Sequence, residues 1–197
     1  MDNTIFSKFN IYDQIGYLMV GSVGLMILAF NFYIFGLVYM IPNFNLENSL
    51  MWFIGAYLFG HTLQAIANIF VKENKVNFSD SEKEILERAN AYFNVAKQSW
   101  GEVYSLCYMS SSAKDITGQV QSFNAYYSLY RGWTIVFGLN SISMLVLNAM
   151  NWFSINYFSL FALSIILTWL FYNRSKRFYG YSRAKTLQTF LINITNK

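Results

Sequence analysis

Residues 50–71 read LMWFIGAYLFGHTLQAIANIFV, a stretch without a single Asp, Glu, Lys or Arg. As an α-helix it would extend about 33 Å at 1.5 Å per residue, slightly more than the roughly 30 Å of hydrocarbon in a bilayer. A formal charge at mid-bilayer costs about 2.5–3.5 kcal/mol on insertion scales, so the absence of charge favours a membrane-spanning helix. The stretch therefore predicts a membrane protein.

Three further stretches contain no charged residue: 15–40, 132–151 and 154–173. We expect the first of them to run to residue 40 and to be closed by Pro42 on the far side of the membrane. Only 12% of the 197 residues are charged, about half of the roughly 25% that is usual in soluble domains. The sequence thus predicts an all-α protein, a four-helix transmembrane bundle in the lipid bilayer.

Lys and Arg are confined to one side of this predicted bundle. One precedes the first span, seven lie between the second and third, and six follow the fourth, which accounts for all 14. Residues 41–49 and 152–153, which join the spans on the other side, have none. Because basic loops stay in the cytoplasm, both termini and the middle loop are predicted inside. Cys107, in that loop, is then a candidate reporter of orientation for impermeant thiol reagents.

The middle loop, residues 72–131, is too long to lack structure of its own. Ser79 and Glu82 have the spacing of a capping box. Apolar residues then recur at helical spacing, at Ile85, Leu86, Ala89, Phe93 and Ala96. We expect this amphipathic helix, and a second one that follows Gly101 and ends near residues 110–112, to form a cytoplasmic insertion.

The third and fourth spans are predicted to extend into the cytoplasm and to pack with the helices of the insertion. No proline interrupts the approach to the third span, and an apolar stripe continues the fourth span through Gly180 into the tail, residues 174–197. No linker or repeat divides the chain. Residues 1–197 are therefore predicted to form a single integral membrane domain.

Polar residues interrupt the second span. His61, Gln64 and Asn68 stand at i, i+3 and i+7, which places them on one face of the helix. Lipid cannot satisfy their hydrogen bonds, so this face is expected to meet other helices or water. In one interpretation they form hydrogen bonds between helices, with partners such as Asn31, Asn140, Ser143 or Asn148.

In the other interpretation, the same face lines an ion or water path with His61 as a gate or relay. A single chain with four spans has little room for a pore between its helices, so this interpretation requires a homo-oligomer. Close helix contacts are permitted by five glycines in the first two spans: Gly16, Gly21, Gly24, Gly55 and Gly60.

Asn124, Tyr127 and Arg131 lie on one face where the third span begins. We expect Arg131 to be a structural or interfacial anchor that pairs with a carboxylate such as Glu102 or with a lipid phosphate. Bases that follow the fourth span are expected to hold anionic lipid headgroups: Arg174, Lys176, Arg177 and Arg183. Because the topology alone accounts for these bases, direct nucleic-acid binding is not expected.

Most catalytic chemistry is excluded by the scarcity of its residues. His61 is the only histidine and Cys107 the only cysteine, and the predicted topology keeps them apart. A Ser–His–Asp or Cys–His site is therefore not expected, and neither a metal site nor a cofactor site is indicated. The enzymatic alternative is a lipid-modifying enzyme that would need Asp13, Glu102 and Arg131 to converge at the inner membrane surface.

Three motifs carry a resemblance to a known group of proteins: Tyr12-Asp13-Gln14-Ile15-Gly16-Tyr17, Gly60-His61-x-x-Gln64-Ala65-x-x-Asn68 and Phe123-Asn124-x-x-Tyr127-x-x-x-Arg131. They resemble small multi-pass bacterial membrane proteins of defence loci, in particular the accessory proteins beside type VI-B RNA-guided RNA nucleases. A relative in such loci carries an Arg-x-x-x-x-His nuclease signature. Here Ala56 stands where that arginine would be, so no nuclease role follows.

The resemblance implies a bacterial inner-membrane effector or accessory protein of CRISPR-type antiviral defence. It further implies an RNA-guided nuclease as partner and permeabilisation of the membrane as a mode of action. The alternative is a membrane scaffold or regulator that does not conduct and that docks a soluble partner through residues 72–131.

Overall fold

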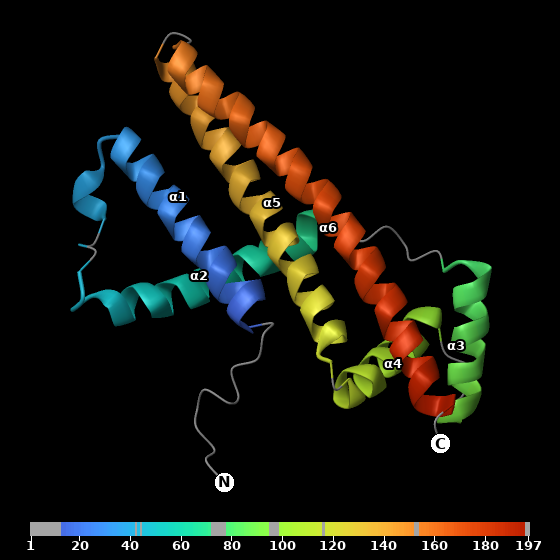
Figure 1. Cartoon of the computed structure of the whole chain (residues 1–197). Helices are drawn as coiled ribbons and strands as arrows, with labels where there is room; N and C mark the ends of the chain where they lie inside the picture. Colours follow the sequence, from blue (N-terminus) through green and yellow to red (C-terminus); the bar gives the residue numbers. More distant parts are fainter. Residues whose placement is uncertain are drawn as a thin grey trace. The chain divides into compact units, whose positions relative to one another are not determined.

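The computed structural model describes residues 13–41, 43, 45–71, 78–94, 99–115, 117–151 and 154–195. All regular secondary structure in these residues is helical, which confirms the predicted all-α class (Figure 1). A π-helix and a short 3₁₀ helix flank the first α-helix. In chain order the elements are η2 (Asp13–Met19), α1 (Val20–Ile34), η3 (Val38–Met40), α2 (Ser49–Phe70), α3 (Asp80–Phe93), α4 (Trp100–Lys114), α5 (Gln119–Met150) and α6 (Ile155–Thr195).

Four helical stretches are long and apolar enough to cross a membrane: Gln14–Ile34, Ser49–Phe70, Gln119–Met150 and Ile155–Thr195. Each contains most of one predicted span. The predicted extensions of the third and fourth spans are confirmed, because α5 and α6 are longer than a bilayer requires and α6 continues through Gly180 without a break.

The chain divides into two compact units. Unit 1 comprises Met1–Lys72 and Ala125–Lys176, and unit 2 comprises Glu73–Asn124 and Arg177–Lys197. Unit 2 thus corresponds closely to the predicted insertion and tail. The count of one domain stays a prediction.

The first span ends earlier than Pro42 indicated. Gly36 adopts φ 75°, and its N–H donates to the carbonyl of Tyr33, while the N–H of Leu37 donates to the carbonyl of Phe32 at 2.8 Å. This pair of bonds is a Schellman motif, which stops a helix because glycine takes the left-handed conformation without strain. The prediction that the helix runs to residue 40 is wrong, and Pro42 itself lies outside the described residues.

Within unit 1, α2 crosses α1 steeply, and glycine makes the crossing close (Figure 1). A Cβ atom at Gly21 would overlap the carbonyl oxygen of Ala56, and one at Gly60 would overlap that of Tyr17. Small residues of this kind let two backbones approach within a membrane. The crossing leads into a core shared by α1, α2 and α5: Val20, Leu63, Ala67, Leu129, Ile135 and Val136.

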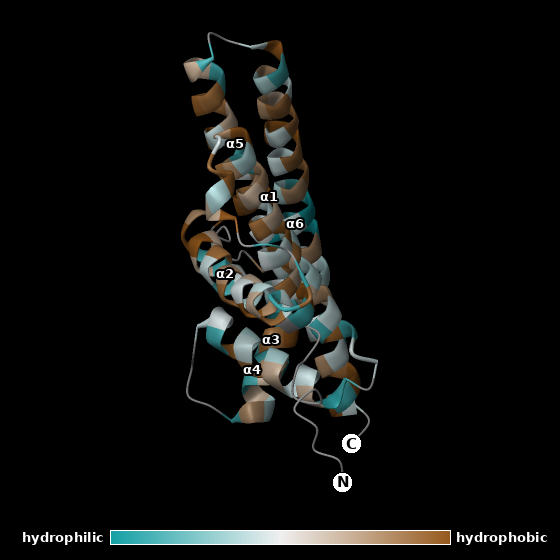
Figure 2. Ribbon diagram, turned by 90° about the vertical axis from the view of Figure 1, so that its left-hand side faces the viewer, coloured by the Kyte–Doolittle hydropathy of each residue, from teal (hydrophilic) through white to brown (hydrophobic). Residues whose placement is uncertain are grey.

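The unit 1 part of α6 packs along α5. Phe171 of α6 lies against three aromatic rings of α5, with centroid distances of 6.1 Å to Tyr130, 5.0 Å to Trp133 and 5.4 Å to Phe137. Further along the pair, Asn140 Nδ2 donates to Ser164 Oγ at 2.7 Å. The unit 1 helices carry many exposed apolar side chains, as a surface against lipid requires. Hydrophobic residues colour much of the ribbon of these helices brown in Figure 2.

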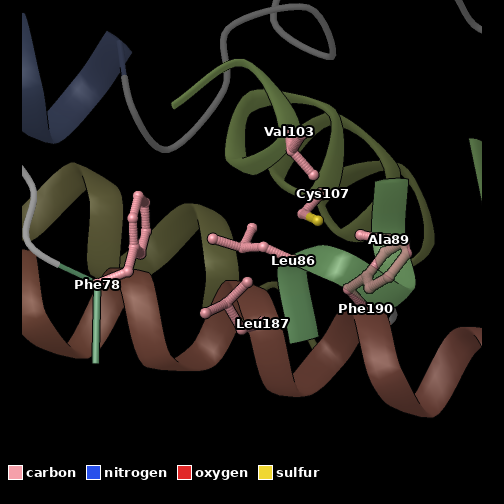
Figure 3. Packing of buried hydrophobic residues seen from close by; sticks show 7 residues of the cluster. All are labelled: Phe78, Leu86, Ala89, Val103, Cys107, Leu187 and Phe190. Atoms are coloured by element: carbon pink, nitrogen blue, oxygen red, sulfur yellow. The ribbon is translucent and has the colours of Figure 1, made fainter. Parts of the chain in front are cut away.

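Unit 2 has a core of its own, built from α3, α4 and the end of α6. Its buried side chains point toward one another in Figure 3: Phe78, Leu86, Ala89, Val103, Cys107, Leu187 and Phe190. The predicted packing of the fourth-span extension against the insertion is thereby confirmed. Of the predicted stripe on the first insertion helix, Ala96 lies outside the described residues.

The helices of unit 2 begin where the sequence provides caps. The predicted capping box is present: Ser79 N donates to Glu82 Oε2 at 2.8 Å and Glu82 N to Ser79 Oγ at 3.4 Å. The Asp115 carboxylate accepts from Thr117 and from Val120 N at the start of α5. Partial burial raises the pKa of Asp115, but these hydrogen bonds and the charge of Lys185 outweigh it and lower that pKa overall.

Replacement of Gly21 by alanine tests the close crossing of α1 and α2. The added methyl group meets the Ala56 carbonyl, so Gly21→Ala should lower the free energy of unfolding by about 1–3 kcal/mol, as overpacking does. The measurement is thermal unfolding in detergent. Gly55→Ala is the matched control, because its Cβ would lie 3.7 Å from the nearest atom, Leu25 Cδ1. Equal melting temperatures for the two variants would contradict the crossing.

Cys107 is a poor reporter of orientation, contrary to its use proposed from the sequence. It is fully buried, and this burial raises the pKa of its thiol to about 12. Because thiolate is the reactive form, we expect a maleimide to label it more than about tenfold more slowly than Ser105→Cys made in a Cys107→Ser chain. Ser105 is exposed on the same helix. Similar rates at the two positions would show that the unit 2 core is open.

Candidate functional site

The polar face of α2 is divided by the fold. His61, Gln64 and Asn68 fall within an arc of about 60° on the helix, as the spacing predicts. Gln64 stands at the edge of this arc that turns inward and is only 4% exposed, whereas His61 and Asn68 are exposed. The three residues therefore share a face but have different surroundings.

The Gln64 side-chain amide joins three segments of unit 1. Its Nε2 donates to the carbonyl of Gly16 in η2 at 3.0 Å and to the carbonyl of Ser128 in α5 at 2.7 Å. Its Oε1 accepts from Arg131 Nη2 at 3.3 Å. Both polar ends of the amide are satisfied away from water, which is the condition for burying such a group.

Glycine permits this arrangement as well. A Cβ at Gly132 would lie 2.8 Å from Gln64 Nε2 and 2.6 Å from Val20 Cγ1, so only a residue without a side chain lets α5 approach. The partners predicted for Gln64 were wrong. The close approach of α5 to α2 places Gln64 beside the part of α5 that contains Ser128 and Gly132. The polar residues expected as partners stand one or more turns further along α1 and α5: Asn31, Asn140, Ser143 and Asn148.

Arg131 is held by residues other than those expected. Its Nη1 donates to Tyr127 Oη at 3.2 Å, and its guanidinium carbon lies 5.0 Å from the centre of the Tyr127 ring. With the bond to Gln64, these contacts hold the guanidinium in a fixed place within unit 1. Its Nε is buried without a hydrogen-bond partner among the described residues. The prediction of an anchoring role is thus compatible with the structure, while the partners it names are not the ones observed.

We compared the chain with known proteins. No family model, curated protein or solved structure matches it.

His61 forms an aromatic group at the outside of unit 1. Its ring stacks on Tyr17 with centroids 3.7 Å apart and planes at 17°, and Tyr57 meets it edge-on at 4.6 Å. Tyr17 also contacts Tyr57 directly. The His61 ring is thereby held between Tyr17 of η2 and Tyr57 of its own helix, and the residue stays exposed.

The remaining predicted site residues are distributed over both units. In unit 2, Asn124 Nδ2 donates to Tyr108 Oη at 3.0 Å, and Arg177 Nε donates to Tyr181 Oη at 2.8 Å. Arg183 forms a two-pronged ion pair with Glu82, with both N···O distances at 2.8 Å. This ion pair gives Arg183 a structural role in unit 2 rather than a free guanidinium for a headgroup.

In unit 1, the two other predicted headgroup residues, Arg174 and Lys176, lie over tyrosine rings. The guanidinium carbon of Arg174 is 5.0 Å from the centre of the Tyr130 ring, and Lys176 Nζ is 4.2 Å from that of Tyr172. Lys176 forms no ion pair with a carboxylate among the described residues. Its charge remains available to anions.

The residues of the enzymatic alternative are engaged separately. Glu102 belongs to unit 2 and accepts from Ser99 Oγ and Ser99 N, and these bonds lower its pKa. Arg131 belongs to unit 1 and binds Gln64 and Tyr127. The side chain of Asp13 lies outside the described residues. Gln64 itself bonds to two backbone carbonyls and to the Arg131 guanidinium, and these hydrogen bonds join three segments of unit 1.

Variants on the two edges of the polar face should differ. Gln64→Leu removes the hydrogen bonds to two backbone carbonyls and to Arg131 and should lower the free energy of unfolding by about 1–3 kcal/mol. Asn68→Leu, at an exposed position of the same helix, should leave the stability of the single chain within about 0.5 kcal/mol. Chemical or thermal unfolding in detergent measures both. Equal losses would show that burial does not distinguish the two side chains.

Proposed function

We propose that this chain is an integral membrane protein that acts as an oligomeric effector or accessory protein in bacterial antiviral defence, without enzymatic activity. The membrane location is supported by four helices of sufficient length and apolarity. The defence setting rests on the resemblance of the three motifs to accessory proteins of RNA-guided nucleases. Placement in the bacterial inner membrane, with the basic side in the cytoplasm, follows from the distribution of Lys and Arg.

The observation that carries the oligomer is the outer edge of α2. His61 and Asn68 are exposed on a helix that is long and apolar enough to cross a membrane. Lipid offers them no hydrogen bond, so such groups turn to protein or water. A second copy of the chain brings the same two side chains and is the simplest partner, since homo-oligomers with closed symmetry are common.

A conducting form of this oligomer has support inside unit 1 as well. Asn31, Asn140 and Ser143 line a small cavity of about 100 Å³ among α1, α2 and α5. Together with the outer edge of α2, this cavity gives unit 1 polar groups at more than one depth, as an ion or water path needs.

The form that does not conduct is favoured by two other observations. The Gln64 amide already forms hydrogen bonds within one chain, so it is not available to line an ion or water path. Unit 2 has a closed core and a two-pronged Arg183–Glu82 ion pair, which makes it a folded platform for a soluble partner. In this form the insertion receives an RNA-guided nuclease and unit 1 anchors the complex.

Flux measurements separate the two forms. The purified protein is reconstituted into liposomes that contain a trapped dye or a potential-sensitive probe. If it conducts, His61→Leu and Asn68→Leu should reduce the flux several-fold, because each removes a polar group from the outer edge of α2. Matched insertion into the liposomes is verified by flotation.

One control variant and two rejecting outcomes make this measurement decisive. Ile166→Leu, a conservative change at an exposed position of α6, should leave the flux unchanged. Absence of flux under every condition, including addition of a candidate nuclease partner, would reject the conducting form. Monomeric mass in mild detergent and in liposomes would reject the oligomer in both forms.

A further inference from the structure

A groove on unit 1 runs between α2, α5 and α6. Its volume is about 700 Å³, within the range of roughly 300–1,000 Å³ typical of small-molecule sites. Its lining includes large side chains from all three helices, among them Ile66, Phe70, Ile142, Ile165, Trp169 and Tyr172. Several of these are well exposed, Trp169 at 63%, so the groove is open along its length.

The threonine and serine hydroxyls of the groove already have hydrogen-bond partners. Thr134 Oγ1 donates to the carbonyl of Tyr130, Ser141 Oγ to that of Gly138, and Thr168 Oγ1 to that of Ser164. Each hydroxyl thus bonds to the backbone of its own helix, a pattern common in membrane helices. The groove therefore presents an apolar wall, which suits a hydrocarbon chain better than a polar ligand.

One end of the groove is positively charged. Tyr172 lines the groove, and Lys176 Nζ lies 4.2 Å from the centre of its ring, so the ammonium group is adjacent to the groove. The sequence contains no Asp or Glu after Asp115, so the helices on either side of this end supply no acid to neutralise it. Tyrosine and tryptophan at such a position are typical of the membrane–water interface.

We propose that this groove binds a phospholipid with an anionic headgroup, with an acyl chain along the apolar wall and the phosphate at Lys176. An anionic lipid satisfies both features at once, because it joins a long apolar chain to a negative charge. An apolar helix of another copy would fill the wall and leave the charge unmatched. The inference rests on the membrane location in the proposed function and is independent of conduction and of a defence partner.

Native mass spectrometry of the purified full-length chain tests the site. The probes are phosphatidylglycerol and phosphatidylcholine with identical acyl chains, titrated into detergent. Since one base near an anionic surface contributes about 1 kcal/mol, wild type should bind phosphatidylglycerol about fivefold more tightly, and Lys176→Gln should abolish most of that preference. Lys114→Gln, a loss of charge at an exposed position in unit 2, should leave the preference intact.

A pair of neighbouring variants tests the acyl part. Ile165→Trp places a larger side chain in the groove and should weaken binding of both lipids several-fold. Ile166→Trp is the matched control, because Ile166 is exposed on the same helix without lining the groove. Circular dichroism verifies that all variants are folded.

Four results would overturn the proposal. An undiminished preference for phosphatidylglycerol in Lys176→Gln would remove Lys176 from the headgroup site. Equal binding by the Ile165→Trp and Ile166→Trp chains would remove the acyl chain from the groove. Competition by soluble glycerol phosphate as strong as by the lipid would assign the site to a free phosphate, and loss of a dimer in Ile165→Trp alone would assign it to a second copy. In each case insertion of the chain into liposomes, which the proposed function requires, is measured separately.

Discussion

The close crossing of α1 and α2 at Gly21 and Gly60 is the constraint on which unit 1 depends. Only at this separation does the Gln64 amide reach a carbonyl of η2 on one side and a carbonyl and guanidinium of α5 on the other. In hydrocarbon, each of these groups would be costly to leave unpaired. The glycines and the amide therefore act together: small residues create the approach, and one polar side chain fixes the register of three segments.

This arrangement changes the meaning of the polar face of α2. Its inner edge, at Gln64, is structural, whereas its outer edge, at His61 and Asn68, remains exposed. One edge of such a face can form hydrogen bonds between helices while the other edge is exposed to a partner or to an ion path, since the two edges meet different surroundings. The stacking of His61 on Tyr17 and its edge-on contact with Tyr57 hold the outer edge in place, so this edge is a defined surface for a partner.

Much of the fold follows from local patterns in the sequence. The uncharged stretches predict the spans because charge is costly in lipid at any position along them. The Ser79–Glu82 box predicts the start of α3 because both partners lie within one turn. Pro42 predicts an end of this helix that is too late, because Gly36 stops it first, and a glycine after an apolar helix is the ordinary signal of a C-terminal cap.

The contacts of the site were less predictable. Gln64 binds the carbonyls of Gly16 and Ser128, and a carbonyl is present at every residue, so the sequence does not mark it. The pairing of Arg183 with Glu82 joins residues 101 positions apart, and helical periodicity has no information over that separation. One residue in the sequence does indicate this contact. Gly132, a glycine next to Arg131 in a helix, marks where another element can approach α5 closely.

The central claim is that the outer edge of α2 meets a second copy of the chain in the membrane. Oxidative cross-linking of Asn68→Cys, made in a Cys107→Ser chain and assayed in native membranes, tests it most directly. The account predicts a disulfide-linked dimer at this position and little dimer for Ile166→Cys, which is also at an exposed position, on α6. Absence of dimer at position 68, or equal dimer at both positions, would contradict the account.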